Sequence, residues 1–219
     1  MNRSLKEWTI RVLLLFAGLV IAHLGVTLFL LTELGSDPFN VMIQGLFRTS
    51  SSLSGWSFLT HGRIHIAVSL LIILVLLLTD RSYIKIGTVI CMVCGGPIID
   101  FFTALLSPLA LALLPLPVRI PILALGCVIL AFGMTVVIKS DAGTGPNDLV
   151  AIVISDKIHK KFSIVRMIVD LCFVVGGWLL GGTFGAGTLI CAFLVGPVAG
   201  FFLPISEKLV NTVLRRLKA

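Results

Sequence analysis

Charged residues are scarce in this chain of 219 residues: Asp, Glu, Lys and Arg together make up 12% of it, whereas 58% of its residues are hydrophobic. Soluble domains carry about 25% charged residues, so water is not the main solvent of this chain. No segment between its apolar runs is long enough to fold on its own. The composition therefore predicts a single membrane domain.

The patterns that carry chemistry are also missing. We find no nucleophile with its base, no Gly-rich loop for phosphate and no cluster of metal ligands, so we expect neither an enzyme nor a cofactor or metal site. The five cysteines lie inside apolar runs, where a disulfide framework is not expected. The net charge of +7 comes from basic residues at the ends of those runs, which is typical of membrane topology and not of nucleic-acid binding.

Six apolar runs are long enough to indicate membrane helices. They cover residues 10–34, 64–79, 84–107, 119–138, 163–180 and 184–205. With the N-terminus in the cytoplasm, only Arg48, Arg63 and Arg119 of the seventeen Lys and Arg residues fall on the outer side. The positive-inside rule therefore predicts a multi-pass protein with both termini in the cytoplasm.

The chain contains an internal repeat. Residues 87–102 match residues 187–202 at eight of sixteen positions, and residues 11–38 match residues 119–146 at nine positions. Residues 1–110 and 111–219 then form two repeats of three spans, and an odd number of spans makes the second repeat inverted. The predicted fold class is an all-α integral membrane protein of six helices in two inverted three-helix repeats.

A Gly-Pro turn and a short apolar segment follow the first span of each repeat. Glycine ends the preceding helix and proline fits the first turn of the next one, so each turn presents a helix N-terminus that can bind a charged group. The short helix is either re-entrant or interfacial. Candidate binding residues at the two turns are Asp37, Pro38, Asn40, Thr144, Pro146, Asn147 and Asp148.

Paired helix breaks are predicted within the third span of each repeat. Gly96 and Pro97 interrupt one span and Gly196 and Pro197 interrupt the other. Proline removes a helical hydrogen bond, so a kink or local unwinding is expected. Such paired breaks are typical of a transporter's central site, although glycine and proline are also common in membrane helices for packing reasons.

Ionisable residues inside the spans are costly and usually serve a function. Asp170 lies near the middle of the fifth span, one turn after Arg166. We expect either a proton or cation site at Asp170 tuned by Arg166, or a purely structural ion pair. Asp100 is a second candidate, or a plain interfacial carboxylate. His23 can relay protons, but a hydrogen-bonded structural histidine is the more common case.

The second repeat carries a motif set that resembles a known family. The residues are Ala142 to Asp148, then Val165-Arg166 with Asp170, Gly177 to Thr183, and Gly187 to Ile190. They resemble the YczE/YyaS/YitT family of bacterial inner-membrane proteins, in its compact YczE-like branch. The first repeat departs from the family's Gly-x-Gly-Pro-x-Asp pattern, because Asp37 stands where a glycine is usual and Asn40 where the aspartate is expected. The resemblance implies a protein of the bacterial inner membrane and supports the fold more than any particular activity.

Our leading hypothesis is a small-solute secondary transporter, coupled to protons or another cation, whose substrate is an unidentified small molecule or ion. A passive channel and a non-transporting membrane scaffold are the alternatives. The expected partners are the lipid bilayer, the solute and a second copy of the chain, with the glycines Gly176 and Gly177 suited to a dimer contact. No nucleic acid is expected.

Overall fold

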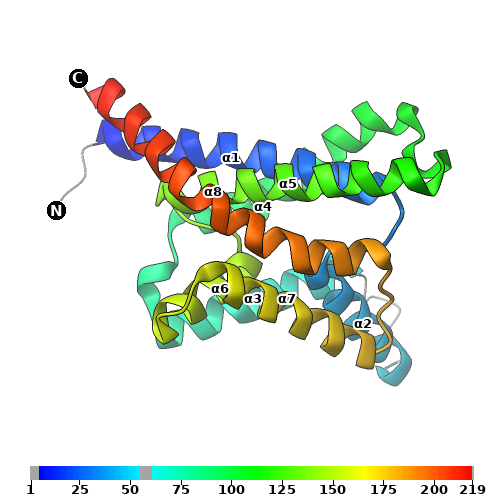
Figure 1. Cartoon of the computed structure of the whole chain (residues 1–219). Coiled ribbons are helices and arrows are strands. Elements are labelled where there is room, and N and C mark those ends of the chain that lie inside the picture. Colours follow the sequence, from blue (N-terminus) through cyan, green and yellow to red (C-terminus); the bar gives the residue numbers. More distant parts are fainter. Residues whose placement is uncertain (1–4, 55–60, 219) are drawn as a thin grey trace.

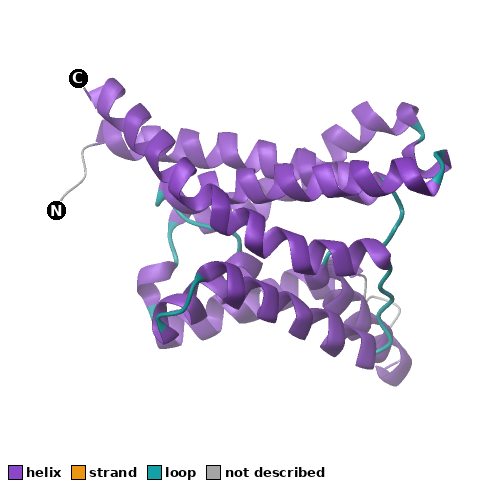
Figure 2. Cartoon of the chain, viewed as in Figure 1, coloured by secondary structure: helices purple, strands orange, loops and turns teal. Residues whose placement is uncertain are grey.

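The computed structural model describes residues 5–54 and 61–218, and every regular element within them is a helix (Figure 2). The α-helices are α1 (Leu5–Leu31), α2 (Pro38–Ser54), α3 (His61–Thr79), α4 (Ile86–Leu106), α5 (Leu116–Ser140), α6 (Pro146–Ile158), α7 (Phe162–Leu179) and α8 (Ala186–Lys218). Three 3-10 turns, η1 (Arg81–Tyr83), η2 (Ser107–Leu109) and η3 (Leu111–Leu113), lie in the connections.

The helices form two layers (Figure 1). One layer contains α1, α4, α5 and α8, with α1 packed on α4 and α5, and α5 packed on α8. The other contains α2, α3, α6 and α7, and contacts between α7 and α8 join the two layers. The short helices α2 and α6 lie toward opposite ends of the molecule, whereas α1 begins and α8 ends at the same end. This arrangement confirms an all-α protein.

Five helices of the described chain are long and apolar enough to cross a membrane: Leu5–Leu31, Ile86–Leu109, Leu116–Ser140, Phe162–Leu179 and Ala186–Leu217. The remaining predicted span coincides with α3, whose apolar stretch, Arg63–Thr79, is shorter. Many large apolar side chains of these helices are exposed, including Leu78 of α3 and Phe101 of α4. A contiguous apolar exterior of this kind is the surface that a bilayer covers.

Glycines bring α1 and α5 into close contact. A Cβ atom on Gly25 would lie 2.5 Å from the carbonyl oxygen of Gly126, and one on Gly126 would lie 2.8 Å from that of Gly25. Likewise, a Cβ atom on Gly18 would lie 2.9 Å from the carbonyl oxygen of Gly133, and one on Gly133 would lie 2.7 Å from that of Gly18. A carbon atom cannot approach an oxygen so closely, so only glycine allows this helix crossing.

Reciprocal hydrogen bonds join the ends of the long helices. The Arg11 side chain donates to the Ser140 carbonyl oxygen at 2.9 Å, and Arg119, its counterpart in the aligned repeat, donates to the Thr32 carbonyl oxygen, also at 2.9 Å. Backbone amides in the first turns of α4 and α8 also donate hydrogen bonds, to carbonyl oxygens in the turns that precede α6 and α2, respectively. The amide of Gly87 donates to Ala142 and that of Gly187 to Leu34, each at 2.9 Å.

One local expectation is wrong. The repeat alignment leaves extra residues in the Ser-rich segment after Phe47, which predicts a loop there, but α2 continues to Ser54. Helices α4 and α8 continue through Pro97 and Pro197, so of the two alternatives, a kink or local unwinding, the unwinding is wrong and the kink stays a prediction. Gly177 packs against the backbone of α2 within the chain, and the second copy of the chain stays a prediction.

Candidate functional site

The centre of the candidate site is a three-residue charge cluster between α6 and α7, which we call the Arg166 cluster. It consists of Arg166 and Asp170 of α7 and Asp148 of α6. Arg166 Nε donates to Asp170 Oδ2 at 2.9 Å, and its Nη1 donates to Asp148 Oδ1 at 2.6 Å. One guanidinium therefore binds two carboxylates through separate nitrogens.

The Arg166 cluster is shielded from solvent. Arg166 is 8% exposed and Asp170 is 1% exposed, whereas the Asp148 side chain is 18% exposed. The second oxygen of Asp170, Oδ1, is buried without a hydrogen-bond partner in the described chain, as is Thr88 Oγ1 of α4. Buried polar atoms are nearly always satisfied, so the unpartnered carboxylate oxygen is an exception within the described chain.

The local sequence explains how Asp148 reaches Arg166. Gly143 adopts a φ of 145°, which side-chain-bearing residues rarely adopt, and it turns the chain out of α5. Pro146 then begins α6, so Asp148 falls in the first helical turn, where a negative charge interacts favourably with the helix dipole. Asn147 donates to Asp148 at 3.2 Å. Thr144 is buried but does not cap α6.

The other Gly-Pro turn is built on the same plan. Gly35 has a φ of 146°, and Pro38 begins α2. Asp37 caps this helix by accepting hydrogen bonds from the backbone amide and the side chain of Asn40. The first turns of α2 and α6 are therefore buried parts of the protein, with Phe39 and Pro146 inside it.

Other predicted site residues lie apart from the Arg166 cluster. Asp100 is exposed on α4, and no polar contact among the residues described joins it to the cluster. Gly196 lies against the Ser163 backbone, while Gly96 faces open space, so both serve as small surface or packing residues. The His23 ring lies next to Gly95 and its Nδ1 is 2.8 Å from the Leu19 carbonyl oxygen, which satisfies that nitrogen.

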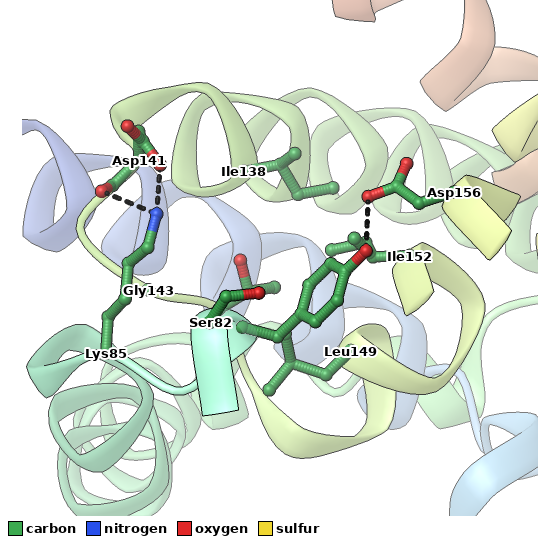
Figure 3. A pocket seen from close by; sticks show the side chains of 10 residues that line it. Ser82, Lys85, Ile138, Asp141, Gly143, Leu149, Ile152 and Asp156 are labelled. Carbon is green, nitrogen blue, oxygen red and sulfur yellow. Dashed lines mark hydrogen bonds and ion pairs between the residues drawn. The ribbon is translucent and has the colours of Figure 1, made fainter. Parts of the chain in front are cut away.

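A polar pocket lies next to the Gly143 turn, and the sequence patterns did not reveal it. It has a volume of about 310 Å³ and lies between the α3–α4 connection, α5 and α6. Two side-chain contacts border it (Figure 3): Lys85 pairs with Asp141, and the Tyr83 hydroxyl donates to Asp156 Oδ2 at 3.1 Å. The only available signal was the charged connection at residues 80–85, whose counterpart at residues 180–185 carries no charge.

Two ionisable groups in the connection that borders this pocket have shifted pKa values. Partial burial and the hydrogen bond to Asp156 raise the pKa of Tyr83 above its ordinary value. Hydrogen bonds from Ser82 lower the pKa of the neighbouring Asp80. Within the described ranges, no group of three His, Cys, Asp or Glu residues is arranged to hold a metal ion.

The apolar helices and the buried charge cluster define a multi-pass α-helical membrane protein. Residues 9–204 match the model of a family of unknown function, DUF6198, and the chain belongs to this family and to the YczE/YyaS group expected from its motifs. It is 32% identical to the uncharacterised membrane protein YczE of Bacillus subtilis, over 98% of this chain and 95% of that protein.

Two further relatives have similar coverage. An uncharacterised protein of Haemophilus influenzae is 29% identical, over 90% of this chain and 84% of its own length. The uncharacterised protein YyaS of Bacillus subtilis is 24% identical, over 87% of this chain and 91% of its own length. No solved structure matches the chain. These relatives support a membrane protein and name no activity.

Proposed function

We propose that this protein is a secondary transporter that couples the movement of a small solute to binding of a proton or another cation at the Arg166 cluster. The observation that carries the proposal is the charge balance there. Asp148 and Asp170 oppose a single Arg166, and Asp170 Oδ1 has no partner in the described chain. An uncompensated charge in a membrane interior costs several kcal/mol, so a bound cation stabilises the cluster.

The proposed architecture is two inverted repeats, residues 1–110 and 111–219, with α3 as the sixth span. Two pairs of equivalent contacts support it, because a two-fold relation between repeats makes each contact occur twice. The contact of Gly25 with Gly126 recurs as that of Gly133 with Gly18. The hydrogen bond from Gly87 to Ala142 recurs as that from Gly187 to Leu34. The 19 residues of α3 are about 28 Å long, close to the hydrocarbon thickness. In this proposal the bacterial inner membrane holds the protein with both termini in the cytoplasm.

Alternating access is supported by a difference between the two ends. At the proposed outer end, Arg48 and Thr49 of α2 donate to the carbonyl oxygens of Gly181 and Leu180, each at 2.7 Å. Gln44 of α2 accepts a hydrogen bond from the Thr183 amide at 2.7 Å. These contacts close the outer end, whereas the polar pocket lies at the inner end. We propose that this conformation faces the cytoplasm and that the outer contacts open in the alternate state.

Flux measurements test the proposal. Purified protein in proteoliposomes with a pH-sensitive dye inside is exposed to amino acids, amines and carboxylates in turn. At least one solute should drive proton movement in the wild type, and Asp170→Asn should remove that movement. The matched control is Glu207→Gln, because Glu207 is a carboxylate outside the cluster that pairs with Lys139.

The other functional classes give different results in the same assay. Downhill solute flux without proton movement, unchanged in Asp170→Asn, supports a passive channel. Absence of flux for every solute supports a membrane scaffold. Either result contradicts coupled transport.

A further inference from the structure

The polar pocket beside α6 has a composition that selects its ligand. Asp141 and Asp156 are its acidic residues and Lys85 is its basic residue. Asp141 pairs with Lys85 and also lies 3.9 Å from the Arg11 guanidinium, so its charge is compensated. Asp156 accepts only from the neutral Tyr83 hydroxyl and makes no ion pair among the described residues. Thus the negative charge of Asp156 is the one left uncompensated.

The walls of the pocket are aliphatic on one side. Ile138 of α5 and Leu149 and Ile152 of α6 line it between the Lys85 pair and Asp156 (Figure 3). Leu149, Ile152 and Asp156 follow the i, i+3, i+7 spacing, which places them on one face of α6. The same helix face therefore offers an apolar surface that ends in a carboxylate.

From this geometry we infer that the pocket binds the ammonium group of a small aliphatic amine, with Asp156 as the acceptor and Ile138, Leu149 and Ile152 in contact with the hydrocarbon part. A volume of about 310 Å³ accommodates a short aliphatic chain with its charged end. Pockets of this kind bind through apolar contact and use a few polar groups for orientation. A carboxylate solute is disfavoured because Asp156 would repel it.

The inference rests on the proposed function and names its substrate class. Asp156 lies eight residues after Asp148 on α6, about 12 Å along the helix axis. Asp148 is the more exposed carboxylate of the Arg166 cluster. An amine held at Asp156 is thus about two helical turns along α6 from Asp148, which belongs to a cluster where two carboxylates oppose one guanidinium. Both sites therefore favour the binding of a positively charged group.

Equilibrium binding tests the inference without any gradient. The full chain in lipid nanodiscs is titrated calorimetrically with pentylamine, with pentanoate and with 1-pentanol, and empty nanodiscs provide the blank. Pentylamine should bind, whereas pentanoate and 1-pentanol should not. Asp156→Asn should weaken pentylamine binding about tenfold, which is about 1.4 kcal/mol, because it removes a hydrogen bond between two charged groups. The control Glu207→Gln should bind as the wild type does.

A second variant tests the contribution of the pocket volume independently of the carboxylate. Ile152→Phe keeps Asp156 and fills the pocket, so it should also lose pentylamine binding. Unchanged binding in either Asp156→Asn or Ile152→Phe overturns the inference, as does binding of pentanoate equal to that of pentylamine. Weaker pentylamine binding in phosphatidylethanolamine than in phosphatidylcholine nanodiscs supports the ammonium site and identifies a lipid headgroup as its source; equal binding supports it with a free amine as the source.

The two proposals fail in different ways. Pentylamine binding without solute flux in proteoliposomes contradicts the transporter and supports the amine site. Proton-coupled flux of another solute without pentylamine binding overturns the amine site alone.

Discussion

Replacing Asp170 by leucine tests whether the Arg166 cluster is a mutually dependent set of charges. Asp170 is 1% exposed and binds Arg166 Nε at 2.9 Å, so its removal leaves a buried guanidinium with Asp148 as the remaining carboxylate. Breaking a buried ion pair by removing one partner costs about 3–5 kcal/mol. Because Asp148 still binds Nη1 at 2.6 Å, we expect about half of that loss, roughly 2 kcal/mol.

The double variant Arg166→Met, Asp170→Leu sharpens this prediction. It removes the buried guanidinium together with its buried partner and leaves Asp148, whose side chain is 18% exposed and can be hydrated. The double variant should therefore lose less free energy of unfolding than Asp170→Leu alone, with a coupling of about 1 kcal/mol or more.

Unfolding by sodium dodecyl sulfate in mixed micelles, followed by tryptophan fluorescence, measures these free energies. Asp100→Leu is the matched control, because Asp100 is an exposed carboxylate on a membrane helix, and it should change the free energy by less than about 0.5 kcal/mol. If Asp170→Leu costs no more than Asp100→Leu, or if the double variant is less stable than the single one, the charges of the cluster do not depend on each other.

Three further predictions concern the helix crossing, the pocket and the topology. Gly25→Ala should lose about 1–3 kcal/mol of unfolding free energy in the same assay, because its Cβ would overlap the α5 backbone, whereas Gly96→Ala, with open space around it, should not be destabilised; equal effects would contradict the close crossing. Tyr83 is the chain's one tyrosine, so phenolate absorbance reports it alone, and it should titrate above the ordinary pKa of 10.0. Asp156→Asn should lower that pKa. Because the folded pKa is higher than the unfolded one, the stabilisation from Tyr83 is fully present below pH 10 and is lost as the pH rises from there through the folded pKa. A fluorescent protein fused after Ala219 should fold and fluoresce, whereas a periplasm-dependent phosphatase fused there should stay inactive; an active phosphatase would reverse the proposed orientation.

Much of the fold follows from local patterns in the sequence. The apolar runs predict α1, α4, α5, α7 and α8 to within a few residues at most ends, because a helix that faces lipid must be apolar along its whole length. The proline positions were less informative. A helix in lipid keeps its remaining hydrogen bonds around proline, since no water competes for them, and so α4 and α8 continue through Pro97 and Pro197.

The candidate site divides in the same way. The pair of Arg166 and Asp170 is readable from the sequence, because four residues in a helix bring side chains to one face. Asp148 is also a visible candidate, but its position 18 residues before Arg166 does not reveal that the two meet. Asp100, like Asp170, is an acidic residue in an apolar run, so the sequence does not distinguish the two. In the structure Asp100 is exposed on α4, away from the cluster.

The sequence by itself determined the membrane class, the positions of most long helices, the aligned repeat and the family. All of these depend on the order of residues along one segment, or on a comparison of one segment with another. Only the tertiary structure decided that Asp148 joins Arg166, that Gly25 lies against Gly126, and that a pocket lies between Lys85 and Asp156. The physical reason is that these features depend on how helices pack, and packing brings together residues that no local periodicity relates.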